Sequence, residues 1–144
     1  DSDSDDSDDS DSDDDSSSDD DSDSSSSYSA QSGDLELMSA IIYCEAGGEI
    51  YAGQLAVGSV VMNRVNSSSF PNSVSAVIYQ SGQFSPVASG RFATVLSNQS
   101  WTSSCESAAK EVLAGNLTVD YLYFHSASGW TSDYGERIGN QIFY

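Results

Sequence analysis

Basic residues are scarce in this chain of 144 residues, which has four Lys and Arg against 23 Asp and Glu and a formal net charge of −19. Nucleic-acid binding depends on Lys and Arg that follow the phosphate backbone, and four scattered cations do not form such a surface. Histidine occurs once, which excludes a zinc site built from several histidines. No apolar run approaches the roughly 20 residues that a membrane-spanning helix needs. We therefore expect no nucleic-acid partner, no membrane span, no metal and no cofactor.

The acidic charge is concentrated at the N-terminus. Residues 1–32 contain 14 Asp and 15 Ser, and no Lys or Arg. Because such a segment has almost nothing apolar to bury and its charges repel one another, it predicts a disordered Asp/Ser-rich linker. Loose cation binding or serine phosphorylation are the alternatives, but no glycine precedes Gly33, which excludes a D-x-D-x-D-G calcium loop. We expect a spacer over residues 1–32 and one compact domain over residues 33–144.

Three segments of the domain repeat apolar residues at helical spacing. Residues 34–46 show this period, with Asp34 as the expected N-cap and two glycines directly after the last residue. Residues 51–65 and 103–114 show it as well. In the first of these two, Gly58 would permit a neighbouring helix to approach closely. The three segments predict a mainly helical domain.

The remaining segments have shorter or weaker patterns. Residues 74–79 are apolar and predict one or two helical turns. Residues 80–100 are rich in Ser, Gly, Gln and Asn without a sustained period, which favours a long binding loop. Residues 121–125 are aromatic and predict a strand, with which the apolar end, residues 138–144, could pair. We expect an α+β fold, mainly helical, with a small antiparallel β element near the C-terminus.

Cysteine occurs twice, as Cys44 and Cys105, and each lies in a predicted helix. In an exported protein an even pair favours a disulfide, which here would join positions 61 residues apart. Closing a loop of that length would add about 4 kcal/mol by the chain-entropy argument. Two buried free thiols are the alternative. We predict the disulfide, and a catalytic cysteine is disfavoured because no base is evident nearby.

Carboxylate chemistry is the class that remains for the domain. The chain lacks a G-x-S-x-G motif, a P-loop and a dinucleotide fingerprint. A Ser nucleophile would have to use the single histidine as its base, and any sequence of this length supplies such a combination by chance. Glu45 and Glu49 stand four positions apart, and Gly47-Gly48 is expected to end the first predicted helix between them. A carboxylic acid there can lie at the edge of a groove, where desolvation raises its pKa and makes it a proton donor. A Glu at a helix end is more often solvated or ion-paired, so its position alone assigns no function.

Several blocks of the domain resemble one known family, the SleB/CwlJ family of bacterial cell-wall hydrolases. The blocks follow the family's order from residue 42 to residue 144, which covers nearly the whole domain. An E-A-x-G-E block followed at a suitable distance by G-Q-F-S-P is far more specific than one short motif. In this sequence the blocks read I-Y-C-E-A-G-G-E-I-Y-A-G-Q-L-A-V-G, G-Q-F-S-P-V, C-E-S-A-A-K-E-V-L-A-G, Y-L-Y-F-H and R-I-G-N-Q-I-F-Y.

The resemblance implies a fold similar to lysozymes and lytic transglycosylases, and an enzyme that acts on peptidoglycan glycan strands. In the family that the chain resembles, the catalytic acid is the first Glu of E-A-x-G-E, which corresponds to Glu45 here. A hydrolase also needs a second carboxylate, about 5–5.5 Å from the acid in a retaining enzyme and about 6.5–9.5 Å in an inverting one. In a lytic transglycosylase the muramyl 6-hydroxyl attacks its own anomeric carbon, and one Glu serves both steps. We expect the transglycosylase, with a hydrolytic muramidase or a non-catalytic glycan-binding module as alternatives.

Five further residues are expected at the substrate. Glu49 is interpreted as an orienting or structural group, because residues four apart on a helix lie on the same wall of a groove. The amide of Gln83 suits acetamido and hydroxyl groups, with a hydrogen bond that holds its own loop as the alternative. Phe84 is expected to anchor that loop in the core. Tyr123 and His125 share one strand face and could line a glycan groove, with ordinary strand packing as the alternative.

The expected partner is peptidoglycan, and the chain is expected to act as a monomer. The expected location is extracellular and associated with the cell wall. Because the domain and the linker are both acidic, charge attraction to anionic wall polymers is not expected to direct it there.

Overall fold

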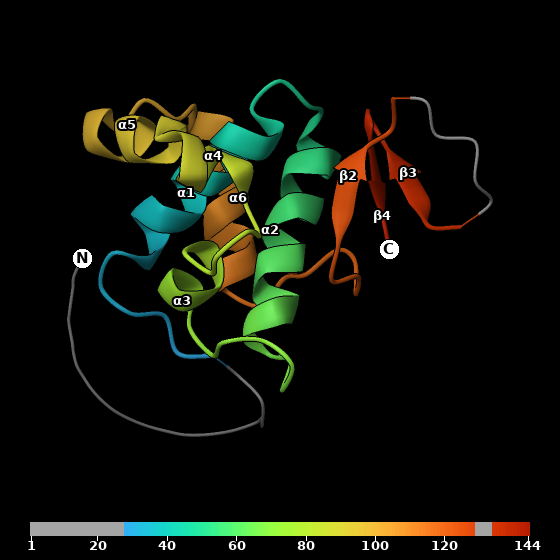
Figure 1. The fold of residues 1–144 in the computed structure, drawn as a ribbon, viewed down its shortest axis with the longest axis horizontal. Coiled ribbons are helices and arrows are strands. Elements are labelled where there is room, and N and C mark those ends of the chain that lie inside the picture. The colour runs from blue at the N-terminus through green and yellow to red at the C-terminus, as the bar shows by residue number, and fades with distance from the viewer. Residues whose placement is uncertain (1–27, 129–133) are drawn as a thin grey trace.

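The structure is a computed structural model that describes residues 28–128 and 134–144. Within these ranges six helices precede a three-stranded antiparallel sheet, so the expected α+β, mainly helical class is confirmed. Figure 1 shows the helices packed in one body and the sheet at its side, next to α2. In chain order the elements are α1 (Asp34–Ala46), α2 (Tyr51–Val65), α3 (Val74–Ile78), α4 (Ser85–Ser89), α5 (Arg91–Asn98), α6 (Ser103–Leu113), β2 (Phe124–Ser126), β3 (Glu136–Ile138) and β4 (Gln141–Phe143).

Residues before the expected domain boundary at Gly33 already contact the folded domain. Tyr28 packs against the core, and its hydroxyl donates to the Asp34 carboxylate at 2.8 Å. That carboxylate also accepts the backbone N–H of Gln31 at 2.7 Å. Asp34 is therefore the first helical residue and fastens the incoming chain, while Gly33 occupies the N-cap that we expected Asp34 to fill. The predicted linker lies outside the described residues up to residue 27.

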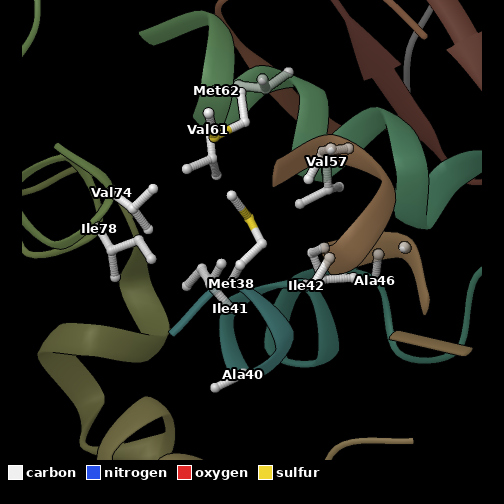
Figure 2. Packing of buried hydrophobic residues seen from close by; sticks show 14 of the residues in the cluster. Met38, Ala40, Ile41, Ile42, Ala46, Val57, Val61, Met62, Val74 and Ile78 are labelled. Carbon is white, nitrogen blue, oxygen red and sulfur yellow. The ribbon is translucent and has the colours of Figure 1, made fainter. Parts of the chain in front are cut away.

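The core is built where α1, α2 and α6 meet. Met38, Ile41 and Ile42 of α1 are fully buried and face Val57 and Val61 of α2 (Figure 2). Full burial of each large apolar side chain stabilises the fold by about 1.5–3 kcal/mol. The cluster takes from α6 the side chains of Cys105, Ala108, Ala109 and Val112. The predicted helices α1, α2 and α6 thus form one packed unit, and this unit fixes where α1 ends and where α2 begins.

Gly58 allows α2 to pack closely on both of its neighbours, as its position in the sequence predicted. A Cβ at this glycine would lie 2.9 Å from Val112 Cγ2 and 3.0 Å from Ile42 Cδ1. Since packed side chains do not tolerate such separations, any larger residue would displace α2 from α1 or α6. The absent side chain therefore sets the spacing of the three helices.

The expected loop over residues 80–100 is wrong for most of its length, because α4 and α5 lie within it. Phe92 and Val95 are buried and Leu96 is half-buried, at the i, i+3, i+4 spacing of an amphipathic helix. Gly90, with φ of +89°, ends α4 and begins α5, so neither helix is long enough to show a sustained period. The irregular part shortens to the segment before α4.

The sheet has the order β2-β4-β3, and β4 is antiparallel to both neighbours. The predicted pairing of the C-terminal end with the aromatic segment is thus confirmed. The strand begins at Phe124, whereas we expected it at Tyr121. Side chains of α2 explain the shift: Asn63 Nδ2 donates to the Tyr121 carbonyl at 2.9 Å, and Arg64 Nε donates to the Leu122 carbonyl at 2.8 Å. These carbonyls are satisfied by a helix and need no partner strand.

The predicted disulfide is not formed, because Cys44 and Cys105 are both free thiols. Cys105 is fully buried in the core. Cys44 is half-buried and lines a hollow at the end of α1, and burial raises the pKa of its thiol. One thiol faces the packed interior and the other a surface hollow, a difference that the even cysteine count could not reveal.

Candidate active site

A groove of about 670 Å³ lies where the end of α1, the segment before α4 and the sheet come together. It unites five of the six side chains predicted for catalysis or substrate binding, and Tyr123 is the exception. The lining residues are Glu45, Glu49, Arg64, Gly82, Gln83, Phe84, Ser85, Ala88, Phe124, His125, Ser126, Asn140 and Gln141.

Glu45 stands in the last turn of α1, and the buried face of that helix fixes its place in the groove wall. Its side chain is half-buried. Burial raises the pKa of the Glu45 carboxyl, and the positive charge of Arg91 acts in the opposite direction. Gln141 Nε2 donates to the Glu45 backbone carbonyl at 2.9 Å, which ties the end of α1 to β4. A carboxyl that keeps its proton to higher pH suits the role of a general acid.

Glu49 follows the two glycines and fastens the loop between α1 and α2 to the sheet. Its Oε1 accepts the backbone N–H of Asn140 at 3.0 Å. Gly139, with φ of +61°, permits this approach, since a Cβ there would collide with the same oxygen. The carboxylate is thus engaged by the turn between β3 and β4, as expected of a structural or orienting group.

Arg64 supports the part of the groove wall that contains Gln83 and Phe84, and its own exposed fraction is only 4%. Its Nη1 donates to Gln83 Oε1 at 3.0 Å, while its Nε holds the Leu122 carbonyl. The Gln83 oxygen is therefore committed to Arg64, and the exposed amide group keeps its N–H donors for a ligand. Three rings surround the guanidinium, with its carbon at 4.9 Å from the centroid of Phe70, 5.2 Å from Tyr123 and 5.3 Å from Phe84.

Phe84 behaves as the expected anchor. It is buried in the core cluster, and its ring centroid lies 6.4 Å from that of Phe124. Its ring also forms part of the groove wall next to Gln83. The segment before α4 is thereby held in place although it has no regular structure.

His125 lines the groove, but its ring nitrogens already have protein partners. Nδ1 lies 2.7 Å from the Ser126 carbonyl oxygen and Nε2 lies 2.8 Å from the Tyr134 hydroxyl. Tyr123 lies outside the groove and stacks on Tyr144 with ring centroids 5.6 Å apart. Both residues contact the Tyr144 ring, as their shared strand face predicted. Ordinary strand packing therefore accounts for Tyr123.

A second hollow, of about 410 Å³, shares Glu45 and Glu49 with the groove. Arg91 lies in its wall, and its Nη1 donates to the Cys44 carbonyl at 2.7 Å. The guanidinium carbon is 5.8 Å from the centroid of the Tyr43 ring. An arginine thus holds the last turn of α1 directly beside the candidate acid.

Sequence reasoning missed two residues that hold the end of α1. Gln141 lies in the C-terminal block that carries the resemblance, but nothing in the block indicates which carbonyl its amide contacts. Arg91 lies in the segment that we expected to be a loop, and only its charge could have drawn attention to it. Both contacts join segments that are distant in the sequence.

The acidic side chains that line the groove are Glu45 and Glu49, counting the part of the chain that the structure describes. Within residues 28–128 and 134–144, no three His, Cys, Asp or Glu side chains gather in a way that could hold a metal ion. The helices of these ranges include none that is both long and apolar enough to cross a bilayer.

Comparisons with known proteins relate this chain to enzymes of bacterial cell walls. The family profile described as Cell Wall Hydrolase matches residues 48–144 and so begins three positions after Glu45. The spore cortex-lytic enzyme of Bacillus cereus is 37% identical over 120 residues, which cover 76% of this chain and 43% of that protein. The corresponding enzyme of Oceanobacillus iheyensis is 36% identical over 120 residues, covering 76% and 41%. The chain therefore spans less than half the length of these relatives.

Two solved structures resemble the fold. The catalytic domain of the germination-specific lytic transglycosylase SleB from Bacillus anthracis superposes with a TM-score of 0.65 at 32% identity, covering 78% of this chain and 94% of that domain. The catalytic domain of the Bacillus cereus SleB protein gives 0.67 at 32% identity, covering 80% and 91%. The expected similarity to a lytic-transglycosylase domain is confirmed.

Proposed function

The chain belongs to the cell wall hydrolase family, and we propose that it cleaves peptidoglycan glycan strands between N-acetylmuramic acid and N-acetylglucosamine as a lytic transglycosylase. One observation carries the proposal: Glu45 stands half-buried in a groove with its pKa raised by burial, and the one other acid in the described groove wall is bound to the sheet. A single acid poised in this way supports a reaction in which one carboxyl serves both steps.

In the first step the Glu45 carboxyl donates its proton to the glycosidic oxygen. The bond between that oxygen and the muramyl anomeric carbon breaks, and the electron pair leaves with the N-acetylglucosamine hydroxyl. In the second step the muramyl 6-hydroxyl oxygen bonds to the anomeric carbon and its proton passes to the Glu45 carboxylate. The products are a 1,6-anhydromuramyl end and a regenerated acid, and no water is consumed.

A hydrolytic muramidase is the second candidate, because Glu49 lines the same groove. A water-activating carboxylate should approach the face of the sugar opposite the acid. Glu49 lies in the loop after α1, and its Oε1 is engaged by the Asn140 N–H, which leaves it less free to activate a water. This arrangement favours the transglycosylase.

Around the acid, Gln83 is proposed to donate its amide N–H groups to acetamido or hydroxyl oxygens of the sugar. His125 is proposed to present its ring to the glycan, since both of its nitrogens have protein partners. We propose action outside the cytoplasmic membrane, where peptidoglycan lies, and a monomeric chain, which size-exclusion chromatography with light scattering would test.

Product analysis tests the reaction. Purified peptidoglycan from vegetative walls and from spore cortex is digested, and the muropeptides are identified by mass spectrometry. We expect 1,6-anhydro ends from the wild type and none from Glu45→Gln, a variant that keeps the size of the side chain and removes its acid. Reducing ends would establish the muramidase instead. Binding without cleavage by both proteins would establish a non-catalytic glycan-binding module and refute the enzyme.

A further inference from the structure

The second hollow continues the site beyond the acid. It shares Glu45 and Glu49 with the groove, so a ligand that reaches the acid from the groove has free space next to it. The additional wall consists of Tyr43, Arg91 and Thr102, together with the end of α1. A linear sugar chain needs only one trough, whereas a second hollow beside the reacting bond can accept a substituent of the sugar.

Arg91 is the cation of this hollow and is held in a defined place. Its Nη1 donates to the Cys44 carbonyl at 2.7 Å, and its guanidinium lies over the Tyr43 ring. Among the described residues, the ion pair that forms is Lys110 with Glu106, and Arg91 forms none. Its charge acts on the Glu45 carboxyl without a direct ion pair, so its free N–H groups are not taken up by a described carboxylate. One contact uses one of the five N–H donors of a guanidinium, which leaves several for a ligand.

The charge of the surroundings makes this arginine selective. Residues 33–144 hold nine acidic and four basic residues, and Glu45 and Glu49 border the hollow itself. An anionic substituent would be repelled from such a wall unless a cation received it. The planar fork of a guanidinium matches the two oxygens of a carboxylate.

We propose that Arg91 binds a carboxylate of the peptide stem carried by the muramyl residue at the cleavage site, and so selects glycan that bears charged stems. The proposal rests on the proposed function, because it places the muramyl sugar beside Glu45. The opposing explanation is that Arg91 acts only through Glu45, by holding the end of α1 and by its charge. The two explanations differ in whether the effect of Arg91 depends on the stem.

Two soluble glycan substrates separate them. Both are strands of alternating N-acetylglucosamine and N-acetylmuramic acid with peptide stems whose amines are acetylated. In one substrate the stem carboxylates are free, and in the other they are converted to methylamides. Cleavage by the wild type, Arg91→Gln and Arg91→Lys is measured on each, with Lys110→Gln as a matched control that removes a cation outside both hollows.

We expect the wild type to cleave the free-carboxylate substrate with a kcat/KM about tenfold above that for the methylamide, the factor that one charge-assisted contact at an exposed site supplies. Arg91→Gln should lose this preference through KM, Arg91→Lys should keep part of it, and Lys110→Gln should keep all of it. Equal cleavage of both substrates by the wild type, or an equal loss on both in Arg91→Gln, would overturn the assignment and leave the proposed function intact. No cleavage of either substrate by the wild type would refute the function and the assignment together.

Discussion

Replacing Glu49 by Gln distinguishes a structural carboxylate from a second catalytic one. The amide oxygen of Gln can still accept the Asn140 N–H that Glu49 Oε1 accepts at 3.0 Å, so the link to the sheet persists without its charge. Hydrogen bonds to charged groups contribute about 1.5–3 kcal/mol and neutral ones about 0.5–1.5 kcal/mol. Because this contact is exposed, we expect Glu49→Gln to reduce the free energy of unfolding by about 1 kcal/mol or less.

The catalytic consequence differs far more between the two roles. A general base or nucleophile contributes about 100- to 10,000-fold to the rate, whereas a loosened loop should lower kcat by less than about tenfold. Glu49→Gln is compared with Glu45→Gln by release of 1,6-anhydro products and by urea unfolding. We expect Glu49→Gln to remain active and Glu45→Gln to be inactive, both folded. A hundredfold loss in folded Glu49→Gln would show that the structural interpretation of Glu49 is wrong.

Three further predictions concern the Glu45 carboxyl, Gly58 and Arg64. Activity should decline as the pH rises through the folded-state pKa of Glu45, because the proton donor is lost, and Arg91→Gln should move that decline to higher pH, since Arg91 lowers this pKa; a pH–rate profile for each protein would measure it, and an unmoved profile would contradict it. Gly58→Ala should destabilise the fold by about 1 kcal/mol, because overpacking costs about 1–3 kcal/mol and the gain in helix propensity is about 1 kcal/mol. Thermal unfolding should show a smaller loss when Val112→Ala is also present, and an equal loss in both backgrounds would refute the clash. Arg64→Lys should cost about 1–3 kcal/mol by urea unfolding, since an ammonium cannot replace both directed hydrogen bonds; a change below about 0.5 kcal/mol would refute this.

The sequence predicted the elements whose signals are local. α1 and α2 have the predicted bounds, because each is a sustained apolar period with an abrupt end. α5 was missed although Phe92, Val95 and Leu96 have helical spacing, since eight residues contain only two turns and a glycine precedes them. Strand β2 was placed too early because its aromatic composition extends beyond its pairing. The strand starts later because side chains of α2 bind the carbonyls that precede it, and no local pattern in the strand sequence indicates those contacts.

In the candidate site, too, local sequence patterns predicted some features, whereas contacts between distant segments could not be predicted. The resemblance located Glu45, and the apolar period of α1 explains why that residue reaches a groove wall. The groups that define its environment come from elsewhere: Gln141 contacts its carbonyl from 96 positions away, and Arg91 contacts the Cys44 carbonyl from 47 positions away. Such pairs depend on how the sheet and α5 dock on the helices, which is a property of the whole packing.

These two contacts also explain how a partly desolvated acid can stay in place. Burial of Glu45 opposes its ionisation, so the folded-state pKa lies above the unfolded one and ionised Glu45 disfavours folding at any pH above the unfolded pKa. A helix end that carried this cost alone could relax by unwinding its last turn and so exposing the carboxylate to solvent. Gln141 and Arg91 instead hold the carbonyls of the last turn of α1, and neither contact consumes a carboxylate oxygen of Glu45. The backbone is fixed while the carboxyl remains available for proton transfer, which is what a reaction that uses one acid twice requires.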